Sequence, residues 1–137
     1  MSDETLYKVI SKLIDNRKYS MVSQINSSVV RLFWEIGGII NEDILNNKRA
    51  KYGKQIVSQI ATQLQEKYGR SYESRNLRRM MQFAEQFPDW EIVSRAATQL
   101  SWSHFVEILP IKSTEAKMYY INQASNNSWE EIISESK

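Results

Sequence analysis

Residues 69–87 of the chain read GRSYESRNLRRMMQFAEQF, with four arginines in the first eleven positions. Apolar residues recur at every third or fourth position, a spacing typical of an amphipathic α-helix. On a wheel of 100° per residue, one side holds Leu77, Met80, Met81, Phe83, Ala84 and Phe87. The other side holds Arg75, Arg78, Arg79, Gln82 and Gln86. The pattern predicts a helix over about residues 72–87 with one face in the core and a basic face in solvent.

The same periodicity extends in both directions from this stretch. Gly and Pro are scarce, at four and two in 137 residues, and no segment alternates with the period of two that a strand needs. Further helices are predicted over about residues 4–15, 19–45, 54–68, 89–97, 101–109 and 115–125. A capping box of Ser128 and Glu131 begins a last one. The expected fold is all-α, a single helical domain over residues 1–137 with about seven helices.

Residues 19–45 are expected to form the central helix of the domain. Its apolar residues spread so widely around the wheel that coverage on more than one side is predicted. Gly37 and Gly38 interrupt this pattern, at a cost of roughly 1–2 kcal/mol relative to alanine. They indicate a close crossing by a neighbouring helix, or a bend. Gly69 is expected to end the helix before it in a left-handed cap, and Ser71 to cap the helix after it.

The charge is low overall and uneven along the chain. The net charge is +2, yet residues 45–80 carry nine Lys or Arg against two Asp or Glu. A local basic segment in a nearly neutral protein is typical of a partner for an anionic polymer. There is no cysteine and one histidine, which excludes disulfides, thiolate chemistry and a multi-histidine metal site. No signal peptide and no apolar run near ~20 residues is present, so a cytoplasmic location without a membrane partner is predicted. No cofactor is expected.

The helices over 54–68 and 72–87, joined by a glycine-containing turn, have the outline of a helix-turn-helix, whose second helix lies in the DNA major groove. Arginine binds phosphates or guanine, and glutamine pairs with adenine. The predicted nucleic-acid-binding residues are Lys51, Lys54, Arg70, Arg75, Arg78, Arg79 and Gln82, with duplex DNA as the expected partner. The match to the motif is loose, because Gln65 stands where a small residue is usual and Arg75 where an apolar one is. The alternative is a protein–protein interaction or homodimerisation module whose basic face is merely solvated.

Several segments, in order, resemble the N-terminal domain of the YhcG-like nuclease family, a bacterial family of unknown function. They are LFWEIGGII (residues 32–40), YGKQIVSQIATQLQEKYGRSYESRNLRRMMQFAEQFP (52–88), QLSWSHFVEILPIK (99–112) and MYYINQASNNSW (118–129). The resemblance covers about residues 15–135. It implies a helical, helix-turn-helix-like DNA- or RNA-binding module that precedes a PD-(D/E)xK nuclease domain. That nuclease domain has no counterpart among these residues, so no catalytic residue is assigned and this chain is not expected to be an enzyme.

Two features imitate catalytic motifs. Pro88-Asp89 and Glu115-Ala116-Lys117 spell PD…ExK, but that chemistry needs carboxylates on adjacent strands around Mg²⁺. Here both carboxylates stand at predicted helix starts, where the helix dipole favours them. His104 has no assignable nucleophile or carboxylate partner, so a structural role is expected. The four tryptophans, Trp34, Trp90, Trp102 and Trp129, are expected to pack in the core.

Overall fold

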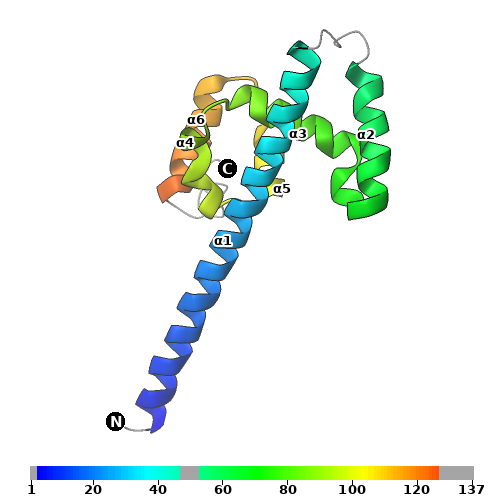
Figure 1. Ribbon diagram of the computed structural model, residues 1–137. Helices are drawn as coiled ribbons and strands as arrows, with labels where there is room; N and C mark the ends of the chain where they lie inside the picture. The colour runs from blue at the N-terminus through cyan, green and yellow to red at the C-terminus, as the bar shows by residue number, and fades with distance from the viewer. Residues whose placement is uncertain (1–2, 47–52, 127–137) are drawn as a thin grey trace.

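The computed structural model describes residues 3–46 and 53–126, and in these ranges every regular element is helical (Figure 1). The elements in order are α1 (Asp3–Asn46), α2 (Gly53–Tyr68), the 3₁₀ turn η2 (Arg70–Tyr72), α3 (Ser74–Gln86), α4 (Trp90–Ser94), the 3₁₀ turn η3 (Ala96–Thr98), α5 (Trp102–Ile108) and α6 (Thr114–Asn126). The all-α prediction is confirmed. The capping box at Ser128 and Glu131, Trp129 and Lys51 lie outside the described residues.

The predicted break between residues 15 and 19 is wrong, because α1 is one continuous helix of 44 residues. The intervening Asn16-Arg17-Lys18 contains neither glycine nor proline. Arginine and lysine are good helix formers, so this polar segment interrupts the apolar pattern without ending the helix. The N-terminal half of α1 extends beyond the other described helices (Figure 1).

The core consists of two clusters of buried apolar side chains, and α3 contributes to both. Phe83 lies in the larger cluster, with Phe105 and Ile121 among its other members. Leu77 and Met80 lie in the smaller one, together with residues of α1 and α2. Leu77, Met80 and Phe83 have no exposed surface. The predicted inward face of this helix is therefore confirmed.

Helix α1 crosses α3 at very short range. A Cβ atom on Gly37 would lie 2.0 Å from the carbonyl oxygen of Met80, so only glycine fits there. On either side of Gly37, Asn41 Nδ2 donates to the Met81 carbonyl at 2.9 Å and Trp34 Nε1 donates to the Phe87 carbonyl at 2.7 Å. The close crossing predicted from the two glycines is confirmed for Gly37. Nothing lies within 4 Å of the corresponding position on Gly38.

The turn between α2 and α3 differs from the prediction in two details. Gly69 has φ 103° and ψ −173°, so it has the positive φ expected of glycine but not the left-handed helical ψ. Ser71 does not cap α3, because η2 intervenes and Glu73 occupies the N-cap position without a side-chain hydrogen bond. The short 3₁₀ turn takes up the residues that the periodicity assigned to the start of the helix.

After Pro88, polar side chains cap the starts of α4 and α6, and one helix is shorter than predicted. Asp89 caps α4 by accepting from the Glu91 amide at 3.0 Å, and Ser113 accepts from the Ala116 amide at 3.2 Å. The helix predicted over 89–97 is divided into α4 and η3.

The apolar residues of α1 are not covered on more than one side, contrary to the prediction. Val22, Ile25, Leu32 and Ile39 are each at least 44% exposed, whereas Val30 and Phe33 are buried. The other described helices pack along one side of α1, and the large apolar residues on its opposite side are exposed.

Candidate nucleic-acid interface

The candidate interface is the outward face of α3, which the core holds in a fixed orientation. Residues Arg75, Arg78 and Gln82 are exposed, and Arg79 is partly exposed. They stand at intervals of three and four, so they share one side of the helix over a rise of about 10 Å. The basic face predicted from the wheel is thus on the surface, opposite the buried Leu77 and Phe83.

Arg70 joins this face from the turn that precedes the helix. It lies in η2 and is exposed. The turn is fixed by Asn76, whose Nδ2 donates to the Ser71 carbonyl at 2.6 Å. The Oδ1 of the same side chain accepts from Trp102 Nε1 at 2.8 Å. Asn76 therefore connects the turn, α3 and α5, a role that sequence reasoning missed because its partners are 5 and 26 residues away.

The four arginines have no acidic partner among the described residues. Arg31 on α1 differs from these four arginines, because its Nε donates to Glu35 Oε1 at 2.9 Å. Its guanidinium carbon also lies 4.9 Å from the ring centroids of Trp34 and Trp90. Arg31 therefore stabilises the fold, whereas the guanidinium groups of Arg70, Arg75, Arg78 and Arg79 are available to an external anion.

The backbone at the start of α3 also contributes a positive electrostatic potential, which favours anions. A helix N-terminus carries unpaired amide N–H groups and a partial positive charge. The first turn of α3 contains no acidic residue, and the Glu73 carboxylate at the N-cap makes no hydrogen bond to it, although its charge offsets part of this potential. Arg75 lies in that turn, so its charge adds to the field of the backbone.

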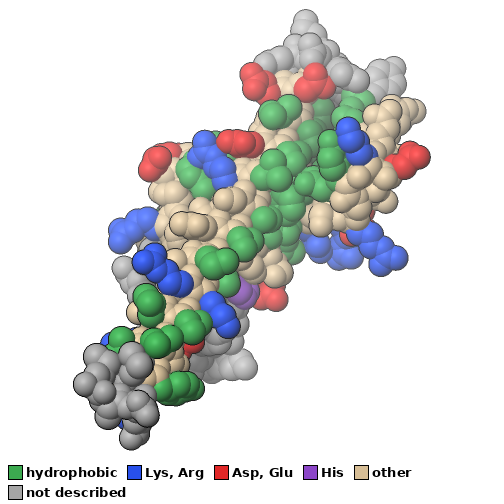
Figure 2. All heavy atoms as spheres, turned by 60° about the horizontal axis from the view of Figure 1, so that its bottom comes forward, with side chains coloured by type: hydrophobic (Ala, Val, Ile, Leu, Met, Phe, Trp, Pro, Cys, Tyr) green, Lys and Arg blue, Asp and Glu red, His purple; other side chains and the backbone are tan. Residues whose placement is uncertain are grey.

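Not every predicted residue belongs to this face. Lys54 is exposed, but it lies in the first turn of α2, about 20 Å of helical rise from Tyr68 at the other end. Gly53 beside it packs near Ile44 of α1. The structure therefore separates Lys54 from Arg70. Figure 2 shows Lys and Arg side chains gathered at the edge of the molecule beside α2.

Gln86 was expected to face solvent with the arginines, but it is bound to the rest of the molecule. Its Nε2 donates to the Leu109 carbonyl at 3.4 Å, and its Oε1 accepts from Lys117 Nζ at 2.5 Å. The outward polar face thus ends at Gln82.

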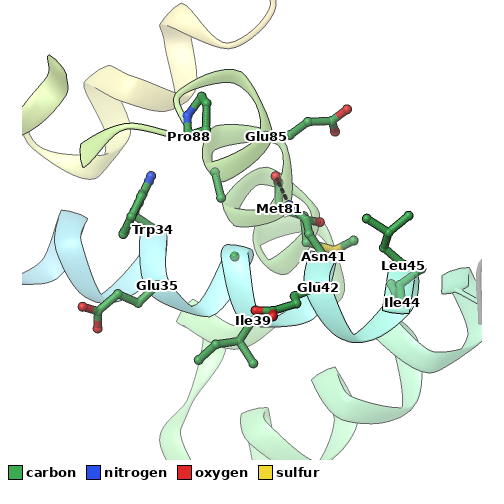
Figure 3. Close-up of a pocket in the computed structure, with 12 residues that line it drawn as sticks. Trp34, Glu35, Ile39, Asn41, Glu42, Ile44, Leu45, Met81, Glu85 and Pro88 are labelled. Carbon is green, nitrogen blue, oxygen red and sulfur yellow. Dashed lines mark hydrogen bonds between the residues drawn. The ribbon is translucent and has the colours of Figure 1, made fainter. Parts of the chain in front are cut away.

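A second surface feature was missed by the sequence analysis. A groove of about 850 Å³ lies between α1 and the C-terminal half of α3. Its lining is largely apolar, with Trp34, Ile39, Met81 and Pro88, and it carries the carboxylates of Glu35, Glu42 and Glu85 (Figure 3). Since the lining comes from two segments 40 residues apart, no local pattern could have indicated it. Its acidic rim makes it unsuited to a nucleic acid.

The residues that resemble catalytic motifs lie at the starts of helices. Asp89 is the N-cap of α4, and Glu115 lies in the first turn of α6. His104 Nδ1 accepts from the Ser101 amide at 3.1 Å and so completes a capping box for α5. Among the described residues, no three His, Cys, Asp or Glu side chains are grouped as a metal site would require.

The described tryptophans pack as predicted, since Trp34, Trp90 and Trp102 contact the core while remaining partly exposed. Across residues 3–46 and 53–126, no helix combines the length and apolar character that crossing a bilayer demands.

Comparisons with known proteins support the resemblance described above. The model of the family described as the DUF1016 N-terminal domain matches residues 9–135. A protein of Escherichia coli (strain K12) named "Putative nuclease YhcG" is 22% identical over 156 residues, which cover 92% of this chain and 42% of that protein. The chain therefore spans less than half the length of this relative. No solved structure shows a significant match.

Proposed function

Because the chain belongs to the DUF1016 N-terminal domain family, we propose that it is a nucleic-acid-binding module, itself without catalytic activity, of a nuclease-like protein. The binding surface is the arginine face, which comprises Arg70, Arg75, Arg78, Arg79 and Gln82. The observation that carries the proposal is that four guanidinium groups gather on one exposed helix face and its turn without a carboxylate partner among the described residues.

Duplex DNA is the preferred ligand of this surface. Helices α2 and α3, joined by a turn, have the outline of a helix-turn-helix, in which the second helix enters the major groove. The outward row from Arg75 to Gln82 has a rise of about 10 Å, which corresponds to about three base steps. Arginines on such a row bind phosphates and guanine edges, and Gln82 can pair with adenine.

The name of the relative supports the same proposal, because a nuclease acts on a nucleic acid. The described part of the chain offers no group of metal ligands; of the candidate carboxylates, Asp89 caps α4 and Glu115 lies in the first turn of α6. The role assigned to the module is therefore to hold the nucleic acid, with cleavage left to another part of a longer protein.

The test is fluorescence anisotropy of a labelled duplex at low salt, with two triple variants of equal charge. One carries Arg75→Ala, Arg78→Ala and Arg79→Ala. The control carries Lys18→Ala, Arg95→Ala and Lys112→Ala, which removes three exposed cations outside α3. We expect the first variant to lose at least tenfold in affinity and the control to change little. Equal binding by the two variants, or no binding by wild type, would refute the proposal.

Self-association is a second candidate function, favoured by a different observation, the uncovered side of α1. It uses none of the residues of the arginine face.

A further inference from the structure

The side of α1 that points away from the other described helices carries a row of large apolar side chains. The row, here named the α1 stripe, consists of Tyr7, Ile10, Ile14, Met21, Ile25, Leu32 and Ile39, each between 44% and 71% exposed. At 100° per residue they fall within about 60° of one another. Figure 2 shows hydrophobic side chains following the length of this helix.

The stripe is larger than a monomeric protein usually leaves in water. From Tyr7 to Ile39 the helix rises about 48 Å, and with a width of about 10 Å the stripe covers roughly 500 Å². Contiguous apolar patches on monomers rarely exceed a few hundred Å² unless they are functional. Two such stripes facing each other would bury about 1,000 Å² in total, which reaches the lower limit for a specific interface.

Apart from Ile10, the residues of the stripe have the same spacing in both directions along the helix. From Tyr7 through Ile14, Met21, Ile25 and Leu32 to Ile39, the intervals are 7, 7, 4, 7 and 7 residues. An antiparallel copy can therefore place Tyr7 opposite Ile39, Ile14 opposite Leu32 and Met21 opposite Ile25. This is the self-complementary pairing that a twofold dimer interface requires.

The charges along α1 distinguish an antiparallel copy from a parallel one. Residues 3–18 contain four cations and three carboxylates, whereas residues 28–43, which face them in this pairing, contain one cation and three carboxylates. A parallel copy would place like charges beside each other at both ends. An antiparallel copy places a segment of net charge +1 beside a segment of net charge −2 at both ends, which is mildly favourable.

The groove between α1 and α3 lies on the flank of the stripe that an antiparallel copy would reach. Ile39 belongs to both the stripe and the groove lining, and Glu35 and Glu42 rim the same flank (Figure 3). In an antiparallel pair related by a twofold axis, equivalent flanks of the two α1 helices lie on the same side of the dimer. Val9 and Leu13, which are 53% and 55% exposed, stand on this flank and would face the groove of the second copy.

From the size, symmetry and charge of this surface, we infer that two copies of the chain form an antiparallel dimer through the α1 stripe. The N-terminal half of each α1, which extends beyond the other described helices (Figure 1), packs along the C-terminal half of the other and covers the groove. The inference is independent of the nucleic-acid proposal, because the stripe and the arginine face share no residue.

The first experiment measures mass by size-exclusion chromatography with light scattering at high micromolar concentration. Wild type is expected at twice the chain mass of 16.1 kDa. Ile14→Asp should give the monomer mass, because it introduces a carboxylate into the stripe. Asn16→Asp adds the same charge on the opposite side of α1 and should remain dimeric. A monomeric wild type, or equal masses for the two variants, would overturn the inference.

The second experiment tests the orientation of the two copies. The chain has no cysteine, so Tyr7→Cys and Ile39→Cys each introduce a single thiol. Under oxidation, a mixture of the two variants should form a disulfide-linked heterodimer, whereas Tyr7→Cys alone should not crosslink, since its thiols would lie about 48 Å apart along the helix. Crosslinking of Tyr7→Cys with itself, without heterodimer, would show a parallel pair and contradict the proposal.

Discussion

Gly37 and Gly38 are neighbours in sequence with opposite surroundings. At Gly37, an added methyl group would collide with the backbone of α3, 2.0 Å from the Met80 carbonyl oxygen. We expect Gly37→Ala to lower the free energy of unfolding by about 1–3 kcal/mol, because the two helices must move apart. Gly38→Ala meets nothing within 4 Å and should raise it by up to about 1 kcal/mol through helix propensity.

Urea denaturation followed by far-ultraviolet circular dichroism measures both changes. If Gly37→Ala were as stable as Gly38→Ala, the close crossing of α1 and α3 would be wrong.

Gly69 sets the direction of the chain between α2 and α3 through its backbone alone. With φ 103° and ψ −173° it occupies a region essentially restricted to glycine, and an added Cβ would meet no other atom within 4 Å. Gly69→Ala should therefore cost about 1–3 kcal/mol of backbone strain. Gly53→Ala, whose nearest atom would be Ile44 Cδ1 at 3.5 Å, serves as the control in thermal unfolding. Equal melting temperatures for the two variants would exclude the strained turn.

At the scale of the element, α3 has two faces with different tasks, and adjacent residues distinguish them. Leu77 is fully buried, whereas Arg78 is exposed. Leu77→Ala is expected to cost about 2–5 kcal/mol of unfolding free energy, because it opens a cavity. Arg78→Ala should change it by no more than about 0.5 kcal/mol. Chemical denaturation of both variants checks this, and a large loss for Arg78→Ala would mean that its side chain stabilises the fold.

Helices were predictable where apolar periodicity and capping agreed. Residues 54–68 and 115–125 were expected, and α2 and α6 extend from Gly53 to Tyr68 and from Thr114 to Asn126. The single length of α1 was missed because the apolar pattern lapses at residues 16–18, while helix propensity does not. The 3₁₀ turn before α3 was missed because it is held by the contacts of Asn76 with Ser71 and Trp102, which no local pattern shows.

The candidate interface could also be predicted only as far as the pattern within a single helix shows it. A helical wheel orients side chains within one helix, so the outward positions of Arg75, Arg78 and Gln82 could be predicted. It does not contain the long-range contacts that bind Gln86 to Leu109 and Lys117. Nor does it show that Lys54 lies at the far end of α2 from Arg70. Both depend on how the helices pack together.

At the scale of the whole molecule, the net charge of +2 is too small to draw the protein to nucleic acid without a local concentration of charge. The arginine face supplies that concentration, since its four guanidinium groups have no acidic partner among the described residues. Because both triple variants remove three positive charges, a general attraction would weaken equally in each. A contact surface on α3 would weaken only when its own arginines are removed.

The most direct test of the arginine face is the salt dependence of duplex binding. If four phosphates are neutralised, log affinity should fall against log salt with a slope of about −3.6. Replacing Arg75, Arg78 and Arg79 with alanine should reduce the slope to about −0.9, because one arginine remains. The Lys18, Arg95 and Lys112 control should keep the slope of wild type. A slope near zero for wild type, or an unchanged slope for the α3 variant, would contradict the assignment of nucleic-acid binding to this face.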